Sequence, residues 1–264
     1  MSTPLTDADV AKMASTVYAA QRDGEAIPML THEYPNLDVE VGYRVQDAVR
    51  RLYLEDGHRQ VGWKAGLTSK AKMRQMNVAE PTVGFLTDRM SVPEGTVIDT
   101  SALVHPRVEC EVAFVLKASL PKEGCTVDDV LAATAYVVPA IEVIDSRYEN
   151  FKFDLASVIA DNSSSSRFVV GANGVRLETI DRTTLGVALV KNGELLTTGA
   201  SAAVLGDPAA AVALVATLAG KMGQTLEAGM TVLSGGITAA FAVSPGDHVS
   251  ARFQSLGVVD VSFR

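Results

Sequence analysis

From Val61 onward, short apolar and β-branched runs follow one another, separated by glycine, proline and asparagine turns. Such runs are typical of β-strands. Two helix signals interrupt them, one at Thr126 and one at Asp207, where Pro208 takes the first helical position. Because strands and helices do not alternate regularly, the order predicts an α+β fold with a mixed or antiparallel rolled sheet. The predicted strands are 61–65, 96–98, 108–116, 136–144, 167–170, 185–190, 231–233, 248–253 and 258–263.

The first sixty residues have a different character. Thr6 or Asp7 can cap a helix that runs to about residue 22, and apolar residues at helical spacing predict a second helix after Asp38. We expect residues 24–37 to form an extended loop. The chain is thereby divided into an N-terminal helical segment, residues 1–60, and a mixed-β catalytic domain, residues 61–264. Further along, Asn192-Gly193 predicts a two-residue hairpin turn.

Composition narrows the classes of function. Apolar residues make up 47% of the 264 residues, which is enough for a sizeable core. The net charge of −8 argues against a surface for nucleic acid or anionic membrane. Cys110 and Cys125 form no C-x-x-C pair, the N-terminus resembles no signal peptide, and we see no apolar run of membrane-spanning length. These features predict a soluble cytoplasmic protein.

Two carboxylates, Glu109 and Glu111, lie two residues apart inside a valine-rich predicted strand. Strand side chains alternate faces, so both point the same way. Adjacent carboxylates repel each other, and burying them without a partner is costly. A divalent cation removes both costs, and oxygen ligands suit Mg²⁺ or Mn²⁺ better than zinc. A solvated strand face is the alternative, and Glu142 in a second predicted strand is a third candidate ligand.

Other candidates point to an anionic substrate. Lys64 lies in an apolar strand just before Gly66, where the backbone N–H groups of Gly66 and Leu67 can help to bind an anion. A lysine at a strand end that reaches solvent is the alternative. Arg147 can form paired hydrogen bonds with a carboxylate of a ligand or, equally, of the protein.

Two polar segments complete the candidates. Residues 159–166 are dense in short polar side chains, and Thr238 offers a hydroxyl after the glycines at 235–236. An ordinary polar loop is the alternative for residues 159–166. The sequence contains no phosphate-binding loop and no nucleophile elbow, and its histidines show no metal-ligand spacing.

Six collinear motifs together resemble the fumarylacetoacetate-hydrolase-like superfamily, in the branch that holds 2-keto-4-pentenoate hydratases and 4-oxalocrotonate decarboxylases. They are G-W-K-A-G-L-T-S at 62–69, E-P-T-V-G-F-L at 80–86, H-P-R-V-E-C-E-V-A-F at 105–114, P-A-I-E-V-I-D-S-R at 139–147, A-D-N-S-S-S at 160–165 and S-G-G-I-T at 234–238. Within that branch, residues 144–153 and 163–167 resemble the decarboxylases, because the hydratases typically carry a tryptophan-containing variant in the first stretch.

The resemblance implies a rolled mixed β-sheet preceded by helices, with one Mg²⁺ or Mn²⁺ held by the three glutamates. It implies that Lys64 and Asp161 face the substrate and that Ser163 and Thr238 contact it. The expected reaction is the decarboxylation of 2-oxohex-3-enedioate (4-oxalocrotonate) to 2-hydroxypenta-2,4-dienoate, with the departing carboxylate at an apolar end of the pocket. The alternatives are the hydratase and a non-catalytic partner subunit of the hydratase. A homo-oligomer and a complex with the hydratase are also expected.

Overall fold

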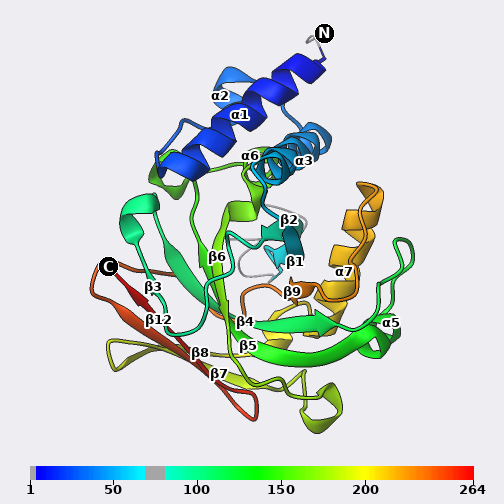
Figure 1. Cartoon of the computed structure of the whole chain (residues 1–264), viewed down its shortest axis with the longest axis vertical. Helices are drawn as coiled ribbons and strands as arrows, with labels where there is room; N and C mark the ends of the chain where they lie inside the picture. Colours follow the sequence, from blue (N-terminus) through cyan, green and yellow to red (C-terminus); the bar gives the residue numbers. More distant parts are fainter. Residues whose placement is uncertain (1–3, 69–80) are drawn as a thin grey trace.

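The computed structural model describes residues 4–68 and 81–264. Three N-terminal helices lie together at one end of the molecule, above the strands (Figure 1). They are α1 (Asp7–Asp23), α2 (Leu30–Glu33) and α3 (Val39–Glu55). Thr6 caps α1 with a reciprocal pair of hydrogen bonds to Asp9, and Asp38 caps α3 by accepting from Val41 N at 2.9 Å.

A seven-stranded mixed sheet follows these helices. Its order is β2-β1-β9-β4-β5-β6, and β10 also pairs with β4. β1 and β9 are parallel, whereas the other pairs of this sheet are antiparallel. The strands are β1 (Gln60–Gly66), β2 (Thr82–Thr87), β4 (Arg107–Leu116), β5 (Thr134–Ile144), β6 (Ser165–Val170), β9 (Thr231–Leu233) and β10 (Phe241–Ala242).

A second sheet of five strands packs its β12 and β11 against β5 of the first (Figure 1). Its order is β3-β12-β11-β7-β8. Asn192 and Gly193 form the turn between β7 and β8, with positive φ angles of 54° and 85°. The predicted hairpin is therefore confirmed. The strands are β3 (Val97–Ile98), β7 (Gly186–Lys191), β8 (Glu194–Ala200), β11 (His248–Phe253) and β12 (Gly257–Phe263).

Short helices connect the strands. Thr126 caps α5 and Asp207 caps α7, with Pro208 at the first helical position of α7, as predicted. The remaining helical turns lie on the connections around the sheets. The helices are α5 (Val127–Ala133), α6 (Leu155–Ala160) and α7 (Pro208–Lys221), and the 3-10 turns are η1 (Thr100–Ala102), η2 (Glu149–Phe151), η3 (Asn162–Ser164), η4 (Leu177–Thr179) and η5 (Ser201–Ala203).

The α+β prediction is confirmed, with three local corrections. The expected loop at 24–37 contains α2, the connection after β5 contains α6, and β2 and β10 were not predicted. One hydrophobic cluster joins residues of the N-terminal helices to both sheets, including Val45, Phe85 and Val261. The division of the chain at residue 60 stays a prediction.

One segment is more apolar than the sequence analysis recognised. Ser201–Lys221, which includes α7, is long and apolar enough to cross a membrane by length and composition alone. The expectation that no run reaches that length was therefore wrong here. However, 50% of its most apolar window is buried inside the protein, and α7 packs against α5, β1 and β2. Core helices of globular proteins have the same character.

Candidate metal centre and active site

The register of two neighbouring strands brings three carboxylates together. β4 pairs with β5 so that Glu109 lies opposite Glu142. Opposed residues of an antiparallel pair share one face of the sheet, and Glu111 shares that face because it lies two residues beyond Glu109. One carboxylate oxygen from each of the three lies within 4.8 Å of the others. All three side chains are buried, so the alternative of a solvated strand face is excluded.

The described residues provide partners for only some of the oxygens of Glu111 and Glu142. Glu111 Oε2 accepts a hydrogen bond from Gly235 N at 2.7 Å, and Lys64 Nζ lies 2.8 Å from Glu142 Oε2. Among the described residues, no hydrogen-bond donor reaches Oε1 of Glu111 or Oε1 of Glu142. Buried acceptors without partners are rare in folded proteins. In the part of the chain that the structure describes, Lys64 is the cation that pairs with Glu142, and Glu111 Oε1 and Glu142 Oε1 stay open to a further positive charge.

The pKa values of Glu111 and Glu142 are both raised in this environment. Burial raises the pKa of Glu111 well above its ordinary range, and Glu142 and Glu109 raise it further. Burial also raises the pKa of Glu142, against the opposing effect of the Lys64 ammonium. For Lys64, burial alone lowers the pKa, but the surrounding carboxylates outweigh burial, Glu142 most of all, and raise it. Lys64 therefore stays charged at neutral pH.

A divalent cation fits this donor set. The oxygens without partners on Glu111 and Glu142 give it ligands, and its charge offsets that of the carboxylates. Carboxylate-only donors match the preference of Mg²⁺ and Mn²⁺. Gly235, whose N–H donates to Glu111, must be a glycine. Its φ is +100°, and an added Cβ would lie only 2.2 Å from Thr68 Oγ1.

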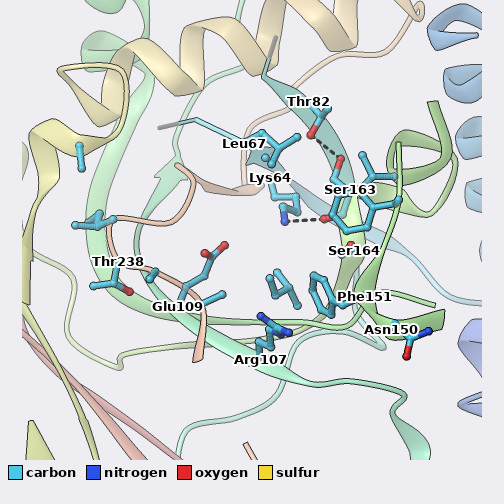
Figure 2. Close-up of a pocket in the computed structure, with 18 residues that line it drawn as sticks. Lys64, Leu67, Thr82, Arg107, Glu109, Asn150, Phe151, Ser163, Ser164 and Thr238 are labelled. Carbon is cyan, nitrogen blue, oxygen red and sulfur yellow. Dashed lines mark hydrogen bonds between the residues drawn. The ribbon is translucent and has the colours of Figure 1, made fainter. Parts of the chain in front are cut away.

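A cavity of about 530 Å³ opens beside the carboxylates. Lys64 projects toward it from β1 and donates to Ser163 O at 3.2 Å (Figure 2). Glu109 reaches into the cavity from β4, while Glu111 and Glu142 do not line it. The lining includes Lys64, Gly66, Leu67, Glu109, Ser163 and Thr238 from the predicted set, together with Thr82, Arg107, Ile144, Asn150, Phe151, Phe153, Val158, Ser164, Ala203, Ile237, Ala239 and Ala240.

The predicted hydroxyls are held by the backbone. Ser163 Oγ donates to Val83 O at 3.0 Å, and Thr238 Oγ1 accepts from Cys110 N at 3.2 Å. Ser163 and Ser164 of the polar segment 159–166 line the cavity, and the neighbouring Asn162 forms two 2.9 Å hydrogen bonds with the backbone of Phe85. These bonds explain the density of short polar side chains in this segment.

Backbone strain is concentrated around this cavity. Five lining residues, none of them glycine, have positive φ angles between 52° and 58°. Such conformations cost free energy and cluster at functional sites. The residues are Leu67, Asn150, Phe151, Ser163 and Ser164.

Two predicted substrate contacts lie outside the cavity. Arg147 Nε is 2.5 Å from Asp161 Oδ1, and the Arg147 guanidinium also donates to the carbonyls of Asp161 and Ser165. Both side chains are buried, and neither lines the cavity. The structure thus contains the structural ion pair that was the alternative for Arg147, and the expectation that Asp161 and Arg147 touch substrate stays a prediction. The pair ties the end of β5 to the end of α6.

Four residues that line the cavity were not predicted from the sequence: Arg107, Phe151, Asn150 and Thr82. Arg107 could have been found by strand alternation, because it lies two residues before Glu109 on the same face of β4. Phe151 carried no such signal, since its position depends on the unusual turn of η2.

Comparisons with known proteins agree with this geometry. The family model for the fumarylacetoacetate (FAA) hydrolase C-terminal region matches residues 60–264. The chain is 48% identical to the 4-oxalocrotonate decarboxylase of Pseudomonas sp. strain CF600, over 100% of both chains. It is 37% identical to 2-keto-4-pentenoate hydratase 1 of Dechloromonas aromatica strain RCB, over 95% of each. The structure of the 4-oxalocrotonate decarboxylase of Pseudomonas putida G7, complexed with magnesium and adipate, superposes with a TM-score of 0.96 at 46% identity over 100% of both chains.

Proposed function

The chain belongs to the fumarylacetoacetate hydrolase family, and from this membership we propose that it catalyses the metal-dependent decarboxylation of 2-oxohex-3-enedioate (4-oxalocrotonate). The products are 2-hydroxypenta-2,4-dienoate and CO₂. The observation that carries the proposal is the buried cluster of Glu109, Glu111 and Glu142, which adjoins a cavity that Lys64 also lines. Full-length similarity to named decarboxylases, at 48% identity, supports the choice of reaction.

The three glutamates would hold one Mg²⁺ or Mn²⁺. When bound, this ion supplies Lewis-acid polarisation of the substrate's C2 ketone. A non-catalytic partner subunit would gain nothing from burying a carboxylate cluster in which Glu111 Oε1 and Glu142 Oε1 lack a hydrogen-bond partner among the described residues, because such burial destabilises the fold.

Lys64 stabilises the negative charge that develops during the reaction. The C5–C6 bond breaks, C6 leaves as CO₂, and the electron pair moves through C4 and C3 onto the C2 oxygen. Protonation of that oxygen gives the dienol product. The Lys64 ammonium is already in place before the negative charge develops. Such preorganised charges usually make a large contribution to lowering the activation barrier.

The backbone around Ser163 orients Lys64. Ser163 O accepts from Lys64 Nζ, and Ser163 Oγ is itself bonded to Val83 O and Thr82 Oγ1, each at 3.0 Å. The ammonium is thus positioned from two sides, by Glu142 and by η3. The apolar lining of Phe151, Phe153 and Ile237 limits water around the reacting chain.

Product analysis tests the reaction. Purified protein with Mg²⁺ is mixed with 2-oxohex-3-enedioate, and CO₂ and ultraviolet absorbance are followed. We expect CO₂ and the dienoate in equal amounts. If no CO₂ forms but the protein consumes 2-hydroxypenta-2,4-dienoate in water, the chain is a hydratase and our reading of residues 144–153 is wrong.

We further propose that the protein acts in the cytoplasm as a homo-oligomer that can associate with a hydratase. The free thiol of Cys125 agrees with a reducing compartment. The dienol product is the enol of 2-keto-4-pentenoate, the compound in the names of the 37%-identical hydratases, so association would pass the product on directly. Light scattering of the protein alone and mixed with such a hydratase measures both assemblies.

A further inference from the structure

A second positively charged side chain, Arg107, faces the cavity from β4, the strand that carries Glu109 and Glu111. Arg107 begins β4 and lines the cavity two residues before Glu109. Figure 2 shows Arg107 and Phe151 across the open space from Lys64, with the guanidinium turned toward that space. Of the described lining residues, Lys64 and Arg107 are the two that carry positive charge, and Lys64 is already paired with Glu142.

Among the described residues, Arg107 is held by an aromatic ring and not by an anion. Its Cζ lies 4.3 Å from the centroid of the Phe151 ring, within the range of a cation–π contact. Within residues 4–68 and 81–264, no carboxylate or hydrogen-bond acceptor pairs with the guanidinium. An arginine that is stacked and oriented, but left with open donors toward a cavity, is suited to a carboxylate that arrives from outside.

Phe151 adopts a costly conformation to make this contact. It has a φ of 57°, and the preceding Asn150 has a φ of 58°. A bulky residue in this region is a genuine outlier, and such strain persists only where the surroundings enforce it. Neighbouring rings of His105 and Phe153, centred 6.2 and 5.9 Å away, hold Phe151 over the guanidinium.

The spacing along β4 matches the length of a six-carbon diacid. Residues two apart on a strand are separated by about 6.7 Å, which is therefore the expected backbone separation of Arg107 and Glu109. In an extended six-carbon chain, the two terminal carbons are about 6 Å apart by ordinary bond lengths. A substrate whose keto-acid end lies at the carboxylate cluster thus places its other carboxylate near Arg107.

We propose that Arg107, stacked on Phe151, binds the distal carboxylate and makes the site selective for dicarboxylates. This inference rests on the proposed function for the identity of the substrate. It adds a positive charge to the apolar end of the pocket where the departing carboxylate is expected to lie. The lining there includes the apolar side chains of Phe151, Phe153 and Val158, together with the positively charged Arg107.

The role is binding more than catalysis. The distal carboxylate loses its charge as CO₂ leaves, so an interaction with Arg107 is strongest in the bound substrate and fades toward the transition state. Removing Arg107 should therefore raise KM while kcat is kept or increased. Loss of a residue that only supported the fold would not raise KM while kcat is kept.

The test compares two ligands on the Mg²⁺-loaded protein by titration calorimetry. Adipate has two carboxylates and hexanoate has one, at the same chain length. The wild type should bind adipate at least about 10-fold more tightly than hexanoate, and Arg107→Leu should lose about 10- to 100-fold in adipate affinity while hexanoate affinity is unchanged. Arg107→Lys, which keeps the charge without the planar fork, should fall between them.

Arg176→Leu is the matched control, since the Arg176 side chain is 78% exposed and forms an ion pair with Glu178. The proposal is overturned if wild-type protein does not discriminate between the diacid and the monoacid. It is equally overturned if Arg107→Leu and Arg107→Lys bind adipate as the wild type does, or weaken both ligands alike. If wild-type protein releases no CO₂ from 2-oxohex-3-enedioate, the proposed function fails, yet the two titrations still decide what Arg107 recognises.

Discussion

Replacing Lys64 with methionine separates its role in catalysis from its role in stability. The methionine side chain would keep the volume of the buried stem and remove the charge. Lys64 Nζ lies 2.8 Å from Glu142 Oε2, with both side chains at most 2% exposed. At that separation, an effective dielectric constant of about 20 gives a Coulomb attraction of about 6 kcal/mol. Desolvation offsets part of it, and removing one partner of a buried pair typically costs about 3–5 kcal/mol.

The loss of stability should depend on the metal. Without it, Lys64→Met leaves Glu142 buried without the cation that it pairs with among the described residues, so we expect the full loss of about 3–5 kcal/mol in free energy of unfolding. With Mg²⁺ the loss should be smaller, and the ion should bind at least as tightly as in the wild type, since a competing positive charge is gone. Urea unfolding with and without Mg²⁺ measures both.

Activity should fall even where the variant is folded. Loss of a preorganised charge at a developing oxyanion typically lowers kcat about 10²–10³-fold. CO₂ release by the Mg²⁺-loaded variant measures this, with Lys117→Met as the matched control, because Lys117 is exposed and remote from the cavity. A kcat/KM for Lys64→Met equal to that of the control would remove Lys64 from the mechanism.

Three further predictions concern the carboxylates and the buried ion pair. Glu142→Gln should abolish CO₂ release and weaken Mg²⁺ binding in calorimetry while the circular dichroism spectrum is kept; retained binding would exclude Glu142 as a ligand. Because the pKa of Glu111 is raised in the folded state, the metal-free fold keeps a proton that the unfolded chain loses near pH 4.5, so its stability should fall as the pH rises above that value. Mg²⁺ needs the deprotonated carboxylates, so the rise in Tm on adding Mg²⁺ should grow with pH, and a constant rise would contradict this. Asp161→Asn should cost about 3–5 kcal/mol in urea unfolding by leaving Arg147 without its counter-ion, with little change in KM; a large rise in KM with unchanged stability would restore a substrate-facing Asp161.

Local signals in the sequence predicted much of the fold. Capping residues and periodicity located α1 and α3, and Asn192-Gly193 located the hairpin between β7 and β8. β2 was missed although every one of its residues is buried, because a strand buried on both faces lacks the alternation that marks a half-exposed one. The six-residue α6 was missed because it is too short for helical periodicity to be recognised.

The candidate site was predictable where it depends on strand alternation. Glu109 and Glu111 share a face by their spacing alone, whereas the pairing with Glu142 requires the register of β4 and β5, which no short segment encodes. The family resemblance filled that gap for the glutamates and for Lys64. The resemblance did not show that Asp161 lies outside the cavity lining. An aspartate can either form a buried ion pair or contact a substrate, and the sequence motif is the same in both cases. Only the surroundings of the side chain in the folded structure distinguish the two roles.

The central claim is that the buried glutamates bind one divalent ion on which decarboxylation depends. Its most direct test is CO₂ release from 2-oxohex-3-enedioate by chelator-treated protein, titrated with Mg²⁺ and paired with the count of ions bound per chain. The account predicts no activity without metal and full recovery as one ion binds per chain. Full activity in the presence of chelator, or a metal content near zero in the active protein, would contradict it.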